Sequence, residues 1–418
     1  MHQAVISGAG FITSIGNDRR EVVESLREGR CGIAPWQAVE GIETPVKIAG
    51  TIKDFDVSAV DPVAWKWPHN YDFDPAFIRT LAPHGLYAAC AIEQALPGAM
   101  LTGEDLRDGG TGLCCASAGS PRLLHHHLNA MARTGWQRSH PLALIRSAAG
   151  TLNYTLGAHY AIRGSNCGFV SACTSSSHAL GFAFDDIALG RQRRMIVVGA
   201  EDLTAENLLP FHAMGALSLN RDPNTASRPF DRERDGFVGT GGAVALIVEE
   251  EQECLRRGVR PMARLLGWGQ ASDGFHVAAP HPEGAGLLLA MKRACEAAKV
   301  RPQEIDYINA HAPSTPAGDR AESLAVKALF GSKSPAISST KALTGHGLSL
   351  AGAMEAAFCV LAIAEGFVPG QFHLREPLPE GTGLDFPSAS REPGPRLVLN
   401  NASGFGGTNV CHVFARYD

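Results

Sequence analysis

The stretch FVSACTSSSHALGFAFDDIALG, residues 169–190, changes its pattern around a single cysteine. An apolar run precedes Cys173, and three serines followed by apolar residues at helical spacing come after it. This pattern predicts a short buried strand, a sharp turn at Ser171 and Ala172, and a buried helix that begins near Cys173. A thiol at a helix N-terminus faces unpaired N–H groups, which lowers its pKa. Two interpretations of Cys173 stay open from this stretch, a nucleophile and a small buried hydrophobe.

Outside this stretch, strand-like apolar runs alternate with helical runs, which is typical of α/β proteins with parallel pairing. The strand-like runs are AVISGAG, RMIVVGAED, GGAVALIVEE, IDYINAHA, AISSTKA and PRLVLNNAS. The helical runs are DDIALGRQ, GLLLAMKRACEAAKV, AGDRAESLAVKALF and LAGAMEAAFCVLAIAEG. The last of these is apolar on almost every side, so we expect a buried helix. The chain divides best near residues 251–260, into an N-terminal half of 1–255 and a C-terminal half of 256–418.

The composition is that of an ordinary globular chain. Of 418 residues, 45% are hydrophobic and 19% are charged, and the net charge of -5 gives no support for nucleic-acid binding. No uninterrupted apolar run is long enough to span a membrane, and the N-terminus lacks a signal-peptide pattern. The ten cysteines are scattered and form no C-x-x-C motif, which indicates a reduced, cytoplasmic chain. Three adjacent histidines, residues 125–127, point to different sides of a helix, so we expect no metal site there.

Three segments of the C-terminal half place reactive residue types directly after apolar runs. His311 follows one such run, and Asp319 is expected to cap the helix that comes next. Lys341 and His346 lie five residues apart, just before the apolar helix that carries Glu355. Since single buried charges are costly, we expect Lys341 and Glu355 to pair and His346 to face a site.

The third segment is NNASGFGGTNV, in which glycines flank Phe405. Gly404, Gly406 and Gly407 allow unusual backbone angles, so that N–H groups can point into a pocket. In open α/β sheets, sites lie beyond the carboxyl ends of the strands. We therefore expect this loop to meet Cys173 and the other two segments in one cleft.

Taken together, the motifs resemble those of a known enzyme family. The order of the cysteine, NAH, STK with TGH, and GFGGTN resembles the elongating β-ketoacyl-acyl carrier protein synthases, and RPFDRERDGFV and STPAGD match the same family. The resemblance runs over nearly the whole chain. It implies the thiolase fold, in which two pseudo-repeated α/β halves form five α-β-α-β-α layers, usually in a homodimer. It implies no cofactor, because the carrier protein supplies the phosphopantetheine arm.

The resemblance also implies a role for each matched residue. Cys173 resembles the nucleophile that takes the acyl chain as a thioester. His311 and His346 resemble the pair that binds the malonyl thioester carbonyl and promotes loss of carbon dioxide. Lys341 resembles the lysine that organises the histidine region electrostatically, with Glu355 as its partner.

The loop around Phe405 resembles two further parts of these enzymes. The backbone N–H groups of Cys173 and Phe405 resemble the oxyanion hole, and the Phe405 side chain resembles the gate over the cysteine. Phe211, Ser403, Gly404 and Pro313 are candidate pocket residues.

Several positions depart from the family pattern. Pro313 stands where a threonine usually helps to hold the pantetheine arm, although the hydroxyl of Thr315 remains. Ser403 replaces an aromatic residue beside the gate, and Gly241 stands where an acid is usual. These changes predict a specialised acyl chain, such as a bulky or polyene chain.

Where basic residues often meet the acidic carrier protein, the segment AWKWPHN has Trp65 and Trp67. Gly215 also stands where a basic residue is frequent. These three positions predict a carrier-docking surface that is less basic than that of housekeeping enzymes.

We therefore expect a decarboxylating acyltransferase that condenses a Cys173-bound acyl chain with malonyl-acyl carrier protein, in fatty-acid or polyketide synthesis. The alternative is a non-catalytic or chain-length-determining partner subunit, which would lack the cysteine. The expected partners are the acyl carrier protein and a second subunit, identical or of the chain-length-factor type. In a dimer we expect residues 111–140 to line part of the acyl tunnel near the interface.

Overall fold

The computed structural model describes residues 2–331 and 333–418. One ten-stranded sheet runs through it, in the order β10-β9-β11-β12-β8-β1-β7-β6-β4-β5. The strands are β1 (Ala4–Ile12), β4 (Thr111–Ala116), β5 (Asn166–Phe169), β6 (Arg194–Glu201), β7 (Gly242–Glu250), β8 (Ala263–Ser272), β9 (Tyr307–Asn309), β10 (Ala336–Ser338), β11 (Leu397–Gly404) and β12 (Thr408–Ala415). A separate hairpin pairs β2 (Ile33–Pro35) with β3 (Ile48–Gly50).

The sheet consists of two halves with the same pattern of directions. In the first half, β5, β4 and β6 are parallel, and β7 and β1 continue antiparallel. In the second half, β10, β9 and β11 are parallel, and β12 and β8 continue antiparallel. A short antiparallel pairing of β1 with β8 joins the halves. This repetition is the pseudo-repeat that the family resemblance implied.

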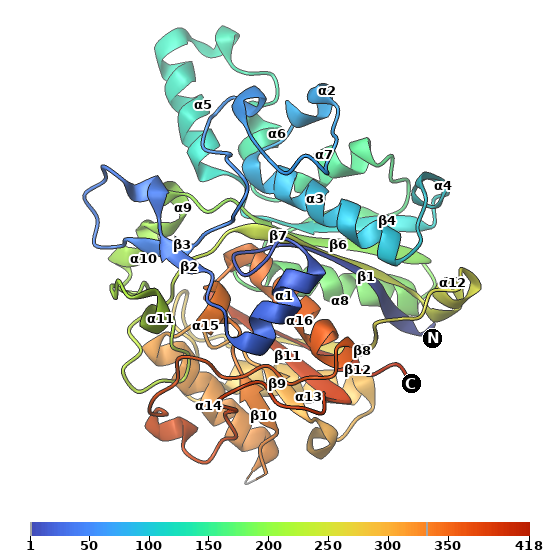
Figure 1. Cartoon of the computed structure of the whole chain (residues 1–418), viewed down its shortest axis with the longest axis vertical. Helices are drawn as coiled ribbons and strands as arrows, with labels where there is room; N and C mark the ends of the chain where they lie inside the picture. The colour runs from blue at the N-terminus through green and yellow to red at the C-terminus, as the bar shows by residue number, and fades with distance from the viewer. Residues whose placement is uncertain (1, 332) are drawn as a thin grey trace.

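Helices cover both faces of each half, which gives five layers (Figure 1). Helix α3 (Pro83–Gly98) packs on the outer face of the first half, and α13 (Ala285–Ala298) and α14 (Pro316–Phe330) cover the second. Between the halves lie α8 (Ser175–Ala188) and α16 (Ala351–Ala364). Every residue of α16 except the last is buried, as its apolar pattern predicts. The predicted thiolase architecture is therefore confirmed.

The remaining helices are short or lie at the periphery. They are α1 (Arg19–Glu28), α2 (Pro75–Ile78), α4 (Gly103–Arg107), α5 (Pro121–Thr134), α6 (Ala143–Ser147), α7 (Leu152–His159), α9 (Ala205–Leu208), α10 (Pro210–Ala213), α11 (Pro223–Ala226), α12 (Glu251–Arg256) and α15 (Lys341–Thr344). Within the described ranges, no helix is long and apolar enough to cross a membrane.

Most of the predicted elements are present at their predicted places. All six strand-like runs contain strands, whereas β4, β8 and β12 of the large sheet were not predicted. The prediction that Trp65 and Trp67 belong to a docking surface was wrong. Trp65 is buried and donates from Nε1 to the Ala59 carbonyl at 2.8 Å, and half-buried Trp67 donates to the Tyr71 carbonyl at 3.0 Å. Both indole rings therefore pack inward and connect this surface segment to the core.

Candidate active site

Cys173 lies on the turn that joins β5 to α8, and the turn is held by its own side chains. The hydroxyl of Ser175 donates to the Ala172 carbonyl at 2.6 Å and accepts from the Ser171 N–H at 2.8 Å. Thr174 donates to the Ser171 carbonyl at 2.7 Å. Ala172 has a φ of 51°, a left-handed conformation that costs energy for a residue other than glycine. The helix begins at Ser175, so the thiol sits on a strained turn just before it.

The surroundings of the thiol have opposing effects on its pKa. Burial raises the pKa of Cys173 to about 12, whereas the charge of Lys341 and the backbone N–H of Phe405 lower it. The net direction is opposite to the lowered pKa that the helix N-terminus predicted, because lost solvation outweighs the attractive groups. Burial therefore favours the neutral form of the thiol in the resting protein.

His311 and His346 face each other near the thiol. Their ring centroids lie 5.2 Å apart at an interplanar angle of 84°, and the residues are 6% and 3% exposed. Burial and the charge of Lys341 hold the pKa of both imidazoles well below the usual range, so both rings are neutral at pH 7. Both Nδ1 atoms are enclosed, without a partner among the described residues. Nε2 is thus the ring nitrogen left to meet a molecule in the cavity.

Behind the histidines lies a fully buried ion pair. Lys341 Nζ contacts Glu355 Oε1 and donates to the His311 carbonyl at 2.5 Å. Burial raises the pKa of Glu355 to about 7, and the Lys341 charge opposes that rise. The pairing expected from the sequence is therefore present, and it fixes the backbone of His311.

A second buried carboxylate, Glu322 on α14, also holds this backbone. Its two oxygens accept from the N–H groups of His311 at 3.0 Å and Ala312 at 2.6 Å, and Asn401 donates to it at 3.0 Å. The sequence reasoning missed Glu322. Its only signal is an acid on the apolar face of a predicted helix, three residues after Asp319.

The glycine-rich loop approaches the nucleophile closely. A Cβ on Gly404 would lie 3.1 Å from the Cys173 nitrogen, so the approach requires glycine. The hydroxyls of Thr408 and Thr174 meet at 2.9 Å and join the loop to the cysteine turn. The Phe405 ring lies 5.7 Å from that of Phe211, and both residues line one cavity with Cys173. The predicted gate residue therefore lies at the nucleophile.

A cavity of about 430 Å³ brings most of the predicted site residues together. Its lining includes Cys173, His311, His346, Phe405, Ser403, Gly404, Phe211, Pro313 and Thr315. Lys341, Glu355 and Asp319 do not line it. The first two act from behind the histidines, and Asp319 lies under the loop that follows His311.

The structure revises the predicted role of Asp319. Thr315 is the N-cap of α14, since its hydroxyl accepts from the Gly318 N–H at 3.2 Å. Asp319 instead accepts from the N–H groups of Ser314 at 3.1 Å and Phe230 at 2.8 Å. The carboxylate is buried, so it organises the loop beside the cavity.

Ser403 takes part in a polar network next to Phe405. Its hydroxyl donates to Asn409 Oδ1 at 2.7 Å, and Asn409 Nδ2 donates to Asp273 at 3.0 Å. Asp273 also accepts from the His281 N–H at 2.9 Å. The space of the missing aromatic ring is therefore bordered by hydrogen-bonded groups that tie loop 273–281 to the glycine-rich loop.

The histidine run lies on α5. The rings of His126 and His127 lie 5.6 Å apart, and no group of three metal-ligating side chains occurs among residues 2–331 and 333–418.

Sequence comparison identifies relatives over the whole chain. The chain is 36% identical to 3-oxoacyl-[acyl-carrier-protein] synthase 1 of Escherichia coli (strain K12), over 100% of this chain and 99% of the relative. It is 34% identical to 3-oxoacyl-[acyl-carrier-protein] synthase 2 of Synechocystis sp. (strain ATCC 27184 / PCC 6803 / Kazusa), over 99% and 98% of the two chains.

Solved structures give the same result. A beta-ketoacyl synthase from Burkholderia phymatum STM815 superposes with a TM-score of 0.91 at 30% identity, and the ishigamide ketosynthase/chain length factor with 0.89 at 28%; both comparisons cover 100% of each chain. The family model of the beta-ketoacyl synthase N-terminal domain matches residues 1–254, and that of the C-terminal domain matches residues 262–375. The chain therefore belongs to the β-ketoacyl synthase family of condensing enzymes.

Proposed function

We propose that this enzyme condenses an acyl chain, held on Cys173, with malonyl-acyl carrier protein to give 3-oxoacyl-acyl carrier protein and carbon dioxide. One observation carries the proposal: a thiol and two neutral imidazoles line one cavity. The relatives named 3-oxoacyl-[acyl-carrier-protein] synthase support the same reaction.

In the first step, Cys173 attacks the thioester of an acyl carrier protein. A bond forms between Sγ and the acyl carbon, the bond to the pantetheine sulfur breaks, and the Cys173 proton leaves on that sulfur. The backbone N–H groups of Cys173 and Phe405 stabilise the oxyanion of the tetrahedral intermediate. The neutral thiol of the resting protein suits a step in which attack and proton loss occur together.

In the second step, malonyl-acyl carrier protein enters the same cavity. Nε2 of His311 and Nε2 of His346 donate to its thioester carbonyl, where negative charge develops as carbon dioxide leaves. In a buried site these donors stabilise the enolate more than water would. The enolate carbon attacks the acyl group, and the released Cys173 thiolate takes a proton from solvent.

The Lys341–Glu355 pair contributes to the second step by positioning His311 and keeping both imidazoles neutral. Lys341 fixes the His311 carbonyl, and its charge lowers the pKa of both imidazoles, which keeps them in the neutral form that donates from Nε2. The phosphopantetheine arm of the carrier protein enters beside Thr315, and the protein needs no cofactor of its own.

We propose a two-fold dimer through the free edge of β5. Asn166 and Cys167 are exposed on that strand, and Val170 and Phe182 beside it are 60% and 47% exposed. Because β5 ends the sheet, a second copy can continue it with backbone hydrogen bonds. We also propose a cytoplasmic location, since all ten cysteines are unpaired.

The second candidate function is that of a non-catalytic partner subunit of the chain-length-factor type. It is considered because the ishigamide ketosynthase/chain length factor is among the similar structures. The intact set of Cys173, His311, His346 and Lys341 favours the catalytic subunit.

Incubation of the purified protein with an acyl carrier protein and malonyl-acyl carrier protein tests the proposal. Intact-mass analysis should show a 3-oxoacyl carrier protein and release of carbon dioxide. An acyl adduct on Cys173 that never transfers to malonyl-acyl carrier protein, with any chain offered, would contradict it.

A further inference from the structure

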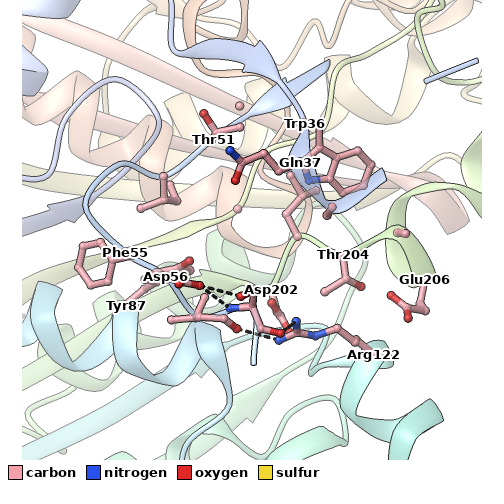
Figure 2. A pocket seen from close by; sticks show the side chains of 18 of the residues that line it. Trp36, Gln37, Thr51, Phe55, Asp56, Tyr87, Arg122, Asp202, Thr204 and Glu206 are labelled. Atoms are coloured by element: carbon pink, nitrogen blue, oxygen red, sulfur yellow. Dashed lines mark hydrogen bonds between the residues drawn. The ribbon is translucent and has the colours of Figure 1, made fainter. Parts of the chain in front are cut away.

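A second cavity, of about 660 Å³, is lined by a separate set of residues (Figure 2). Its walls are β3, the loop 51–58, α3, the start of α5 and the segment 202–206, and none of its lining residues lines the Cys173 cavity. Gly241, where the family usually has an acid, belongs to this lining. The volume lies within the range of small-molecule sites.

Asp202 provides an unpaired acceptor in the wall of this cavity. The residue is 4% exposed, and the Ser120 hydroxyl donates to Oδ2 at 2.5 Å. Its other oxygen, Oδ1, accepts no hydrogen bond from any described residue. Oδ1 is not among the fully enclosed unpaired atoms, so it is reached from the cavity, where the donor group of a ligand can meet it.

Tyr87 on α3 also provides a polar group without a hydrogen-bond partner. The residue is 7% exposed, it lines the cavity, and its hydroxyl has no hydrogen bond within the described part of the chain. Burial raises the pKa of Tyr87, and the charge of Asp202 raises it further. The hydroxyl and the carboxylate therefore act on the same space.

The charge of the cavity is negative. Asp56 and Glu206 are exposed members of its lining, so with Asp202 it has three carboxylates. Arg122, the cation among the described lining residues, uses its terminal nitrogens on backbone carbonyls, donating to Ser58 at 2.6 Å and to Val57 at 3.0 Å. Arg122 thus holds the loop wall in place, and its charge partly offsets that of Asp202, so the three carboxylates still leave the lining net negative.

The rest of the lining is aromatic and aliphatic. Trp36 and Phe55 border the space on sides away from Arg122 (Figure 2), and Ile52 and Leu203 add aliphatic surface. Aromatic and aliphatic surface takes up the apolar part of a ligand, and the carboxylates attract an ammonium group by charge.

We propose that this cavity binds an organic ammonium ion with an apolar body, its ammonium group on Asp202 Oδ1 and the Tyr87 hydroxyl, and its apolar part against Trp36 and Phe55. The ligand differs in class from the acyl thioesters of the reaction. The inference does not depend on the proposed function.

Isothermal titration of the full chain with three probes of similar size tests the charge requirement. 2-Phenylethylamine should bind with one site per chain, 2-phenylethanol should bind more weakly by about tenfold, and phenylacetate should not bind. Equal binding of all three probes, or no heat with the amine at millimolar concentration, would overturn the proposal.

Two variants locate the site. Asp202→Asn should weaken amine binding by at least about tenfold, and Ala38→Trp, at an exposed position of the lining, should block it by filling the space. Glu40→Gln, at an exposed position outside the lining, is the matched control and should bind like the wild type. If Asp202→Asn does not fold, Ala38→Trp decides alone, and unchanged amine binding in a folded Ala38→Trp protein would refute the assignment.

Discussion

The two halves of the protein hold their catalytic residues in the cavity in different ways. In the first half, Cys173 is held by hydrogen bonds among its neighbours, such as Ser175 to Ala172 and Thr174 to Ser171. In the second half, the Lys341 ammonium group holds the His311 carbonyl. The His346 N–H donates to the Val238 carbonyl at 2.6 Å, across the two halves. The turn that carries the nucleophile is therefore held mainly by local hydrogen bonds, whereas the backbones of the histidines are held by groups from distant parts of the chain.

This difference separates the two half-reactions. Acyl transfer to Cys173 needs the strained turn and the N–H groups beside it. Decarboxylation also needs the neutral imidazoles and the buried pair behind them. Variants of the histidines and of the Lys341–Glu355 pair should therefore leave acylation largely intact, and variants of the turn should stop both steps.

The largest effect is expected for Cys173→Ser. A serine hydroxyl has no comparable anionic form near pH 7, so condensation should fall by at least about 10³-fold while the fold is retained. Product formation from acyl and malonyl carrier proteins measures the loss. The matched control is Cys167→Ser on the exposed strand β5, which should stay active. Condensation by Cys173→Ser at near wild-type rate would show that the nucleophile is another group.

The next largest effect is expected on the free energy of unfolding, when the buried pair Lys341–Glu355 is broken. Lys341→Met leaves Glu355 buried without its partner, which should cost about 3–5 kcal/mol in the free energy of unfolding. The double variant Lys341→Met with Glu355→Gln should recover most of that stability but not the condensation rate. Urea unfolding and the condensation assay separate the two outcomes. A single variant as stable as the wild type would show that the pair does not hold this region.

A smaller effect is expected at Ser403. Ser403→Phe restores an aromatic residue beside Phe405 and should slow acylation by conjugated or aryl chains by about tenfold more than acylation by saturated medium chains. Ser403→Ala, which removes the bond to Asn409 but keeps the space, is the matched control. If the wild type already reacts as fast or faster with the saturated chains, the predicted preference for specialised chains is wrong.

The smallest effect concerns pH. Burial raises the pKa of Glu201, which accepts from Ser349 and Asn207, to about 8. A carboxyl with a raised pKa in the folded state stabilises that state below its unfolded pKa, and the contribution is lost as the pH rises to about 8. Glu201→Gln should therefore flatten the fall of unfolding free energy between about pH 5 and pH 8, as measured by urea titrations. The same slope in Glu201→Gln and the exposed control Glu40→Gln would reject this assignment.

The fold was largely predictable because most elements have an unbroken apolar pattern. The missed strands have weaker patterns. Glycines interrupt β8, in which Gly267 and Gly269 pack closely against α13, and β12 begins inside the glycine-rich loop. Their pairing depends on neighbouring strands in the sheet, and a local sequence pattern does not predict that pairing.

For the site, the motifs predicted the residues that line the cavity and the Lys341–Glu355 pair behind them, but not the other groups that hold them. Glu322 and Glu201 are buried acids, and only the assembled structure shows their partners. The thiol pKa was predicted in the wrong direction, because the extent of burial around Cys173 is a tertiary property. Trp65 was misplaced for the same reason.

The most direct test of the account separates the two half-reactions in His311→Ala. The variant and the wild type are incubated first with an acyl carrier protein and then with malonyl-acyl carrier protein, and intact mass and released carbon dioxide are followed. The account predicts that Cys173 in the variant acylates at close to the wild-type rate, while carbon dioxide release falls by about 10²-fold and the acyl-enzyme accumulates. Unchanged carbon dioxide release in His311→Ala, or loss of acylation with normal folding, would contradict it.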